Sequence, residues 1–262
     1  MAVNYAEIAD FIGNTLRLKT LPVAAHFLKD KSGFPANTRQ PSVAMQKRIT
    51  ICMGVSMARL YGWTLGMTKD DLICTPAMIV FGFTDAADQP ATLARLFCDI
   101  AFASNPDKAL QEAGSMHRLP NQAYEALLLL PLAKTTAPPD TVLLYGNPAQ
   151  VMRLAQAYSF SSGARVDGHF GGKVECDEYL IAPFQTGKAR VAIPGMGDRI
   201  FSMTQDDELV FALPGHDLEP LVQGLKAAGN KIGARYPITS YQNFQPAFPK
   251  YHMALGRELG LW

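Results

Sequence analysis

The chain has 262 residues, of which 48% are hydrophobic and 18% are charged, and its formal net charge at pH 7 is +1. These values are typical of a globular protein with a substantial core. They exclude the basic footprint of a nucleic-acid-binding protein, since no basic run is longer than Lys47-Arg48, and the longest apolar run, 126–133, is too short to span a bilayer.

The first half of the chain is predicted to combine helices with buried strands. Apolar residues recur at helical spacing over 3–18, and the apolar segment Pro22–Leu28 indicates a strand. A loop rich in Lys, Gly, Pro and Asn is expected over 30–41. The other predicted elements are a helix over much of 43–61 that closes at Gly62, a turn or helix start at 68–71, buried strand-like segments at 72–74 and 77–83, and helices at 89–103 and 107–113.

The second half follows a predicted linker, Lys134–Asp140, which contains two prolines. A strand is expected at Thr141–Tyr145, and a helix from Pro148 to about Tyr158, because proline suits the first turn of a helix. The remaining predictions are a loop at 161–173, strands at 174–183, 188–193, 200–203 and 208–213, a tight loop at 194–199, a helix from Asp217 to about Ala228, and a last helix from about Pro249 to Trp262.

Together these elements predict an α/β or α+β fold with mixed sheets, organised as one globular module over 1–262 with a helical C-terminal tail. Two segments, 55–75 and 151–177, also resemble each other. Each is a helix-like stretch followed by a glycine-containing loop and a short apolar strand around a cysteine. We therefore expect an internal duplication, at about 20–134 and 140–230, whose halves pack about a pseudo-twofold axis.

The duplication would bring Cys74 and Cys176 together, with Cys52 nearby at the start of the first repeated helix. The N-terminus lacks a basic start and an apolar block, which predicts a cytoplasmic protein with reduced thiols. Because thiolates bind soft metals and iron–sulfur clusters, we predict that these three cysteines bind a [4Fe–4S] cluster with one iron open. Plain core packing and a catalytic thiol are the alternatives. Cys98, inside a predicted helix, is expected to pack in the core.

Other residues predict contacts with a small anionic molecule. Arg199 can hold a carboxylate or phosphate through two hydrogen bonds, oriented by Asp198, although a hairpin with an internal ion pair fits the pattern equally well. Asn147 and Pro148 open a helix whose first backbone N–H groups suit an anion. His169 lies in a glycine-rich loop before the third cysteine, where its imidazole could approach the thiol or remain exposed to solvent.

The two repeated helix starts are expected to face the pseudo-symmetric centre, because Cys52 aligns with Pro148. A helix N-terminus favours a thiolate, so the pKa of the Cys52 thiol is expected to be lowered.

Four stretches make the chain similar to the domain-of-unknown-function 169 family of bacteria and archaea. This resemblance covers roughly residues 6–230 and implies a single cytosolic module with cysteines at positions 52, 74 and 176. It implies no established reaction. The stretches are Leu21-Pro22-Val23-Ala24, Cys52-x-x-Val55-x-x-Ala58 leading to Cys74, Asn147-Pro148-Ala149-Gln150-Val151-Met152-Arg153, and Gly197-Asp198-Arg199 followed by Asp207-Glu208.

Three functional hypotheses follow. The first is a cytosolic metalloprotein that uses its cluster for redox or sulfur-transfer chemistry on a small anionic substrate. The second is a metal-free module that binds a carboxylate or phosphate through Arg199 and the Pro148 helix start. The third is an assembly protein, including a homo-oligomer, whose partner surface is the apolar segment 126–133 if that segment is exposed.

Overall fold

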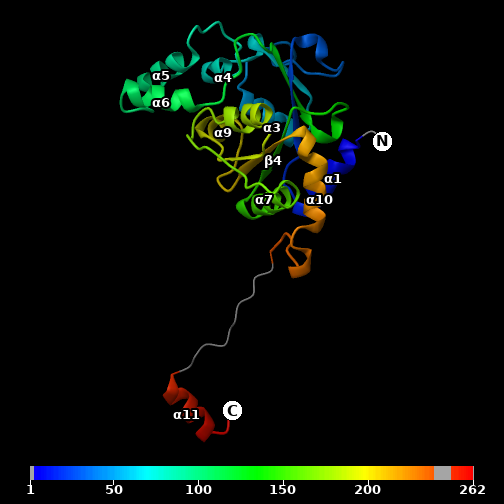
Figure 1. The fold of residues 1–262 in the computed structure, drawn as a ribbon, viewed down its shortest axis with the longest axis vertical. Helices are drawn as coiled ribbons and strands as arrows, with labels where there is room; N and C mark the ends of the chain where they lie inside the picture. The colour runs from blue at the N-terminus through cyan, green and yellow to red at the C-terminus, as the bar shows by residue number, and fades with distance from the viewer. Residues whose placement is uncertain (1–2, 239–248, 262) are drawn as a thin grey trace.

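A six-stranded sheet with helices on both faces forms the centre of the protein in a computed structural model that describes residues 3–238 and 249–261 (Figure 1). The strand order is β2-β3-β1-β4-β6-β5, and each neighbouring pair is antiparallel. The predicted combination of helices and strands is therefore confirmed, but the sheet is antiparallel throughout its described strands rather than mixed. The strands are β1 Val23–Leu28, β2 Leu65–Thr68, β3 Ala126–Pro131, β4 Thr141–Gly146, β5 Arg190–Ala192 and β6 Leu209–Pro214.

The helices agree with the sequence pattern where a cap or proline marks their start. Thr50 accepts a hydrogen bond from the Met53 N–H, and Gly62 ends the same helix in the left-handed region at φ 69°. The α-helices are α1 Tyr5–Leu16, α2 Pro41–Ala44, α3 Ile51–Tyr61, α4 Thr75–Val80, α5 Gln89–Asp99, α6 Pro106–Ser115, α7 Pro148–Ser162, α8 Ala182–Thr186, α9 Met196–Phe201, α10 Leu218–Ala227 and α11 Lys250–Glu258. The last one confirms the predicted C-terminal helix, although Trp262 lies outside the described residues.

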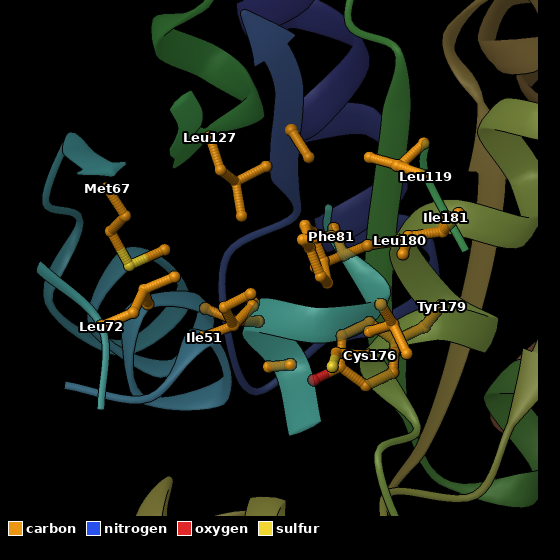
Figure 2. Packing of buried hydrophobic residues seen from close by; sticks show 14 of the residues in the cluster. Ile51, Met67, Leu72, Phe81, Leu119, Leu127, Cys176, Tyr179, Leu180 and Ile181 are labelled. Atoms are coloured by element: carbon orange, nitrogen blue, oxygen red, sulfur yellow. The ribbon is translucent and has the colours of Figure 1, made fainter. Parts of the chain in front are cut away.

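Side chains alternate across the sheet and form two hydrophobic clusters, one on each face. Val23 and Ala25 point to the cluster that contains the buried side of α3, whereas Ala24 points to the cluster that contains α1, α7 and α10. Figure 2 shows the α3-side cluster, in which Ile51 and Phe81 lie among other buried side chains. The two faces therefore carry different helices, and the candidate site described below lies on the α3 side.

Four predicted strand or loop segments, at 77–83, 174–183, 194–199 and 200–203, are wrong, because they overlap helices. The segment 77–83 overlaps α4, which begins at Thr75, and 174–183 contains a π-helix, Asp177–Ile181, that leads into α8. The predicted loop and strand at 194–203 contain α9. A short run of apolar residues can form either a buried strand or a helix that is buried on all sides. The spacing of its apolar residues does not distinguish the two structures. Pro76 and Pro183 near helix starts were the available signal.

The apolar segment 126–133 is buried except for Ala133 at its end, which overturns its predicted role as an exposed assembly surface. It forms β3, between β1 and β2, and each of its strand residues is buried. The predicted linker after it does not separate two domains either. It joins strands of one sheet, and the Asp140 carboxylate accepts a 2.7 Å hydrogen bond from the Phe27 N–H. Residues on both sides of the segment thus share one core.

The pseudo-twofold arrangement is not confirmed. The strand order does run β2-β3-β1 on one side and β4-β6-β5 on the other. A twofold axis between the antiparallel strands β1 and β4 would place α3 and α7 on the same face, but they pack on opposite faces. In addition, Cys74 follows β2 whereas Cys176 precedes β5. The two sequence segments that resemble each other therefore occupy different positions in the fold.

In the described part of the chain, no helix has both the length and the apolar character needed to cross a membrane.

A buried histidine on β1 gives a pH-dependent stability. His26 Nε2 lies 3.0 Å from Thr135 Oγ1, and burial lowers the pKa of His26, with Asp140 partly opposing that shift. Since the folded pKa lies below the unfolded one, the unfolded chain takes up a proton first as the pH falls below about 6.5. We expect the free energy of unfolding to decrease between pH 7.5 and 5.5, by about 1.4 kcal/mol for each unit of pKa difference.

Urea denaturation at both pH values measures this effect. The His26→Gln variant, which keeps a hydrogen-bonding side chain but does not titrate, is expected to show a smaller pH dependence than the wild type. Equal pH dependence in the two proteins would contradict the assignment to His26.

Candidate functional site

Three of the four cysteines line one cavity of about 190 Å³ on the α3 side of the sheet. Cys52 lies in the first turn of α3, Cys74 directly precedes α4, and Cys176 directly precedes the π-helix. The fourth, Cys98, does not line this cavity and packs against the neighbouring core. The three cysteines that the sequence analysis grouped thus border a common cavity, although the expected twofold axis is not the reason.

Local structure fixes each of these sulfur atoms near the core. Ile51 is buried and anchors the start of α3, so that Cys52 turns to the cavity, where its Sγ lies 2.9 Å from Thr50 Oγ1. Cys176 is buried, and Figure 2 shows it next to Tyr179 at the end of the cluster where the π-helix begins. A π-turn is rare and is often found at functional sites.

The thiols are held in their protonated form by the surroundings. Burial, together with a smaller effect of the nearby Asp198 carboxylate, raises the pKa of Cys52 to about 12. Burial also raises the pKa of Cys74, and that of Cys176 well above its usual range. The expected lowering of the Cys52 pKa by the helix N-terminus is therefore wrong, because desolvation outweighs the dipole in this pocket. A cation that binds here must displace thiol protons.

Two carboxylates complete the polar part of the cavity. Asp198, at the start of α9, accepts hydrogen bonds from the Tyr179 hydroxyl at 2.8 Å and from the Gly195 N–H at 3.0 Å. Burial raises the pKa of Asp198, against the effect of these hydrogen bonds. Glu175 accepts from the Gly171 and Gly172 N–H groups, and burial raises its pKa to about 7.

Sequence reasoning missed Glu175 and Tyr179, because the segment 174–183 was taken as a strand. The available signal was the density of acidic residues in an apolar stretch, Glu175, Asp177 and Glu178, which are all buried. Buried carboxylates that are so close together require an explanation, since charged groups are costly to bury.

Arg199 and Asp198 do not form the predicted pair. The Arg199 guanidinium donates to the Gln205 carbonyl at 2.8 Å and lies 3.5 Å from Asp206, near the surface, whereas Asp198 points into the cavity. The two adjacent side chains on α9 therefore face different surroundings. Arg199 is not among the residues that line the cysteine cavity.

Asn147 and Pro148 lie at the start of α7, on the opposite face of the sheet from the cysteines. The Asn147 side chain accepts from the Gln150 N–H and donates to the Tyr236 hydroxyl, so that it caps the helix. The expectation that this helix start faces a common centre with Cys52 is wrong, since the two helices cover different faces.

His169 is not directed at a thiol but at a carboxylate. Its side chain is 70% exposed, and its Nδ1 lies 3.2 Å from Glu178 Oε1. Among the described residues, one group of His, Cys, Asp or Glu has its ligand atoms within 4.8 Å of one another, and it consists of His117, His169 and Glu178. Two members of this group, His169 and Glu178, border a second, smaller cavity of about 130 Å³.

Among the described residues, the cysteines of the cavity therefore do not have the spacing of ligands for one metal ion. A cluster places its thiolates further apart than a single ion does, because each thiolate binds a different iron. The volume of the cysteine cavity, about 190 Å³, is large enough for a group of the size of benzene, which an apolar cavity of about 150 Å³ can hold. The donor set of three thiols beside Asp198 fits a thiophilic centre with a position not filled by cysteine.

The family to which the chain is similar has a model that covers the whole of this site. A family model described as DUF169, "Uncharacterised ArCR", matches residues 12–224, which include every residue that lines the cysteine cavity. An uncharacterized protein of Methanocaldococcus jannaschii is 24% identical over 176 residues, 67% of this chain and 75% of that protein. No solved structure gives a significant match. The descriptions state no reaction, so the chemistry of the site is the guide to function.

Proposed function

The chain belongs to the DUF169 family, and we propose that it is a metalloprotein in which Cys52, Cys74 and Cys176 hold an iron–sulfur cluster. The observation that carries this proposal is the convergence of three thiols from separate elements on one cavity. Isolated core cysteines have no reason to share a cavity, whereas ligands of one cofactor must do so. In the reducing cytoplasm, which we propose as its location, such thiols stay available for metal.

Each cysteine of the cavity has a defined part in this proposal. All three supply a thiolate after losing a proton, which the raised pKa values oppose until a cation arrives. A cluster with three cysteine ligands supplies one-electron chemistry and an iron that accepts a further ligand. The site therefore suits a redox or sulfur-transfer reaction on a small anionic molecule.

Neighbouring residues would orient and balance the charge of this centre. Asp198 lines the cavity and is held in place by the Tyr179 hydroxyl and the Gly195 N–H. Its carboxylate would be the fourth ligand of the cluster. Lys173 lines the same cavity, with its ammonium 2.8 Å from Glu112 Oε1 and over the rings of Phe97 and Phe102. Its positive charge partly offsets the thiolates, and the aromatic rings limit the access of water.

The metal-free alternative, a module that binds a carboxylate or phosphate, has less support. Its two predicted parts, Arg199 and the Pro148 helix start with Asn147 as its cap, lie on opposite sides of the sheet, because α9 packs against α3 and α7 packs against α10. Arg199 Nη1 and the Asn147 side chain also each have a hydrogen-bond partner within the protein. A small anion could not contact both side chains at once.

Anaerobic purification and reconstitution test the proposal. The wild-type protein is expected to be brown, with broad absorption near that of known clusters and about four iron and four sulfide per chain. Cys52→Ser, Cys74→Ser and Cys176→Ser are each expected to lose most of this iron, whereas Cys98→Ser retains it. The Cys98 variant is the matched control, since Cys98 is also partly buried but lies outside the cavity.

Two outcomes would contradict the cluster. One is a colourless protein without iron after anaerobic reconstitution. The other is an equal loss of iron in Cys98→Ser and in the three cavity variants, which would mean that the iron is bound without regard to the cavity.

A further inference from the structure

A second cluster of metal-ligand side chains lies outside the cysteine cavity. His117 follows α6, His169 lies in the loop after α7, and Glu178 lies on the π-helix. Glu178 Oε1 is 3.2 Å from His169 Nδ1 and 4.0 Å from His117 Nε2. One ligand atom from each residue thus lies within 4.8 Å of the other two.

The carboxylate at the centre of this cluster is only half satisfied. The Glu178 side chain is 6% exposed, and its Oε2 has no hydrogen-bond partner among the described residues. Two neighbouring carboxyl groups, Glu175 and Asp177, are also buried. Glu175 Oε2 likewise has no hydrogen-bond partner among the described residues. A buried oxygen without a donor costs free energy, and a cation at this point would remove that cost.

The orientation of His117 gives an independent sign of a metal site. Its Nδ1 lies 3.3 Å from Gln185 Oε1, and the Gln185 amide nitrogen donates to the Arg118 carbonyl at 2.7 Å. The second bond sets the amide so that its oxygen faces the histidine, which then carries its proton on Nδ1. The His117 Nε2 is then unprotonated, and its lone pair is directed towards Glu178. Histidines that bind metal usually donate their other N–H to such an acceptor.

The backbone holds the other parts of the cluster in place. The His117 N–H donates to Asp177 Oδ2 at 3.0 Å, which fixes the segment after α6 to the π-helix. The loop with His169 is tied to β5, since the Val191 N–H donates to the Asp167 carbonyl at 2.9 Å. A side chain at Gly168 would lie 2.2 Å from the Val191 carbonyl, so this close approach requires glycine.

We propose that His117, His169 and Glu178 form a site for one divalent transition-metal ion, of which Zn²⁺ is the best match. Two imidazole nitrogens and one carboxylate oxygen are the donors that Zn²⁺ binds at about 2.0–2.2 Å, and three protein ligands leave a fourth position for water. The exposed side of His169 gives an ion access from solvent. Ligand atoms around a tetrahedral Zn²⁺ lie about 3.3 Å apart, so the 4.0 Å separation between His117 Nε2 and Glu178 Oε1 must shorten when the ion binds, whereas the 3.2 Å separation between His169 Nδ1 and Glu178 Oε1 already fits.

The test uses Co²⁺ as a coloured substitute for Zn²⁺ on the full-length, metal-free and reduced protein. Co²⁺ bound to thiolates has an intense near-ultraviolet charge-transfer band, whereas Co²⁺ bound to nitrogen and oxygen shows only weak visible bands. We expect about one equivalent of the second kind, displaced by Zn²⁺. The two signals separate this site from the cysteine cavity, so the failure of one proposal is distinguishable from the failure of the other.

Variants then assign the signal to its ligands. His169→Ala and Glu178→Gln are expected to remove the weak visible bands and to leave any thiolate band unchanged. Gln185→Leu, which acts through His117, is expected to weaken binding by about 10- to 100-fold. His216→Ala is the matched control, because His216 also lies near a carboxylate, 3.6 Å from Asp217, and is exposed.

The site would be refuted if His169→Ala bound as much Co²⁺ without thiolate character as the wild type. It would also be refuted if the wild type showed no such Co²⁺ at all. Because the His169 side chain is largely exposed, its removal is compatible with folding, so the outcome does not depend on the more buried Glu178 variant.

Discussion

Glu208→Ala is expected to lower the free energy of unfolding by about 3–5 kcal/mol, because it leaves the buried Arg59 charge without a partner. The Arg59 residue on α3 is 2% exposed, and its guanidinium donates to both Glu208 oxygens, at 2.7 and 3.1 Å. It also lies over the Tyr145 ring, 4.0 Å from the centroid. Urea denaturation of the two proteins measures the difference.

The adjacent residue supplies a control with the same chemistry. Asp207 pairs with Lys19 at 3.5 Å, but both side chains are largely exposed. Asp207→Ala is therefore expected to change the free energy of unfolding by at most about 1 kcal/mol. Replacing both charges, as in Arg59→Met with Glu208→Leu, should recover much of the stability lost in the single variant. Equal effects of Asp207→Ala and Glu208→Ala would contradict the assignment.

This ion pair also connects stability to the candidate cofactor site. It joins α3, which carries Cys52, to the start of β6, and Glu208 additionally accepts a 2.8 Å hydrogen bond from the Gln205 N–H in the turn after α9. The helix α9 in turn carries Asp198. Loss of the pair is thus expected to loosen two walls of the cysteine cavity together, even though neither charged residue lines it.

Local sequence signals were sufficient to predict helix boundaries where the capping residue interacts only with its neighbours along the chain. Asn147 and Gln150 form a capping box around the Pro148 helix start, and Gly62 closes α3 in the conformation that glycine favours. These positions depend on a few adjacent residues. The helix boundaries that they mark were therefore predictable without the tertiary fold.

Features that depend on long-range contacts were not predictable in the same way. Arg59 resembles an ordinary solvated helix residue in the sequence, because its partner Glu208 is distant along the chain. Glu178 is identified as a candidate ligand only when His117 and His169 lie beside it. The grouping of the three cysteines was obtained from a presumed repeat that the structure does not confirm, which shows that a weak similarity can indicate the right residues for the wrong reason.

Gly224→Ala is the second substitution with a large expected effect on stability. Gly224 lies within α10, where that helix packs on α7, and an added Cβ would lie 2.0 Å from the Ala157 carbonyl oxygen. That atom belongs to the backbone of α7 and cannot move without shifting the helix. We expect a decrease in the free energy of unfolding of about 3 kcal/mol or more, which is the upper part of the range for overpacked cores.

Gly13→Ala provides the matched comparison, since Gly13 also lies inside a helix, α1, but has open space where the Cβ would be added. Alanine there is expected to stabilise the protein by about 0.5–1 kcal/mol, because glycine loses more conformational freedom in a helix. The two identical chemical changes should therefore have opposite signs in urea denaturation. Similar effects at both positions would mean that helix propensity, rather than the contact between α7 and α10, determines the response, and the close approach of those helices would then be in error.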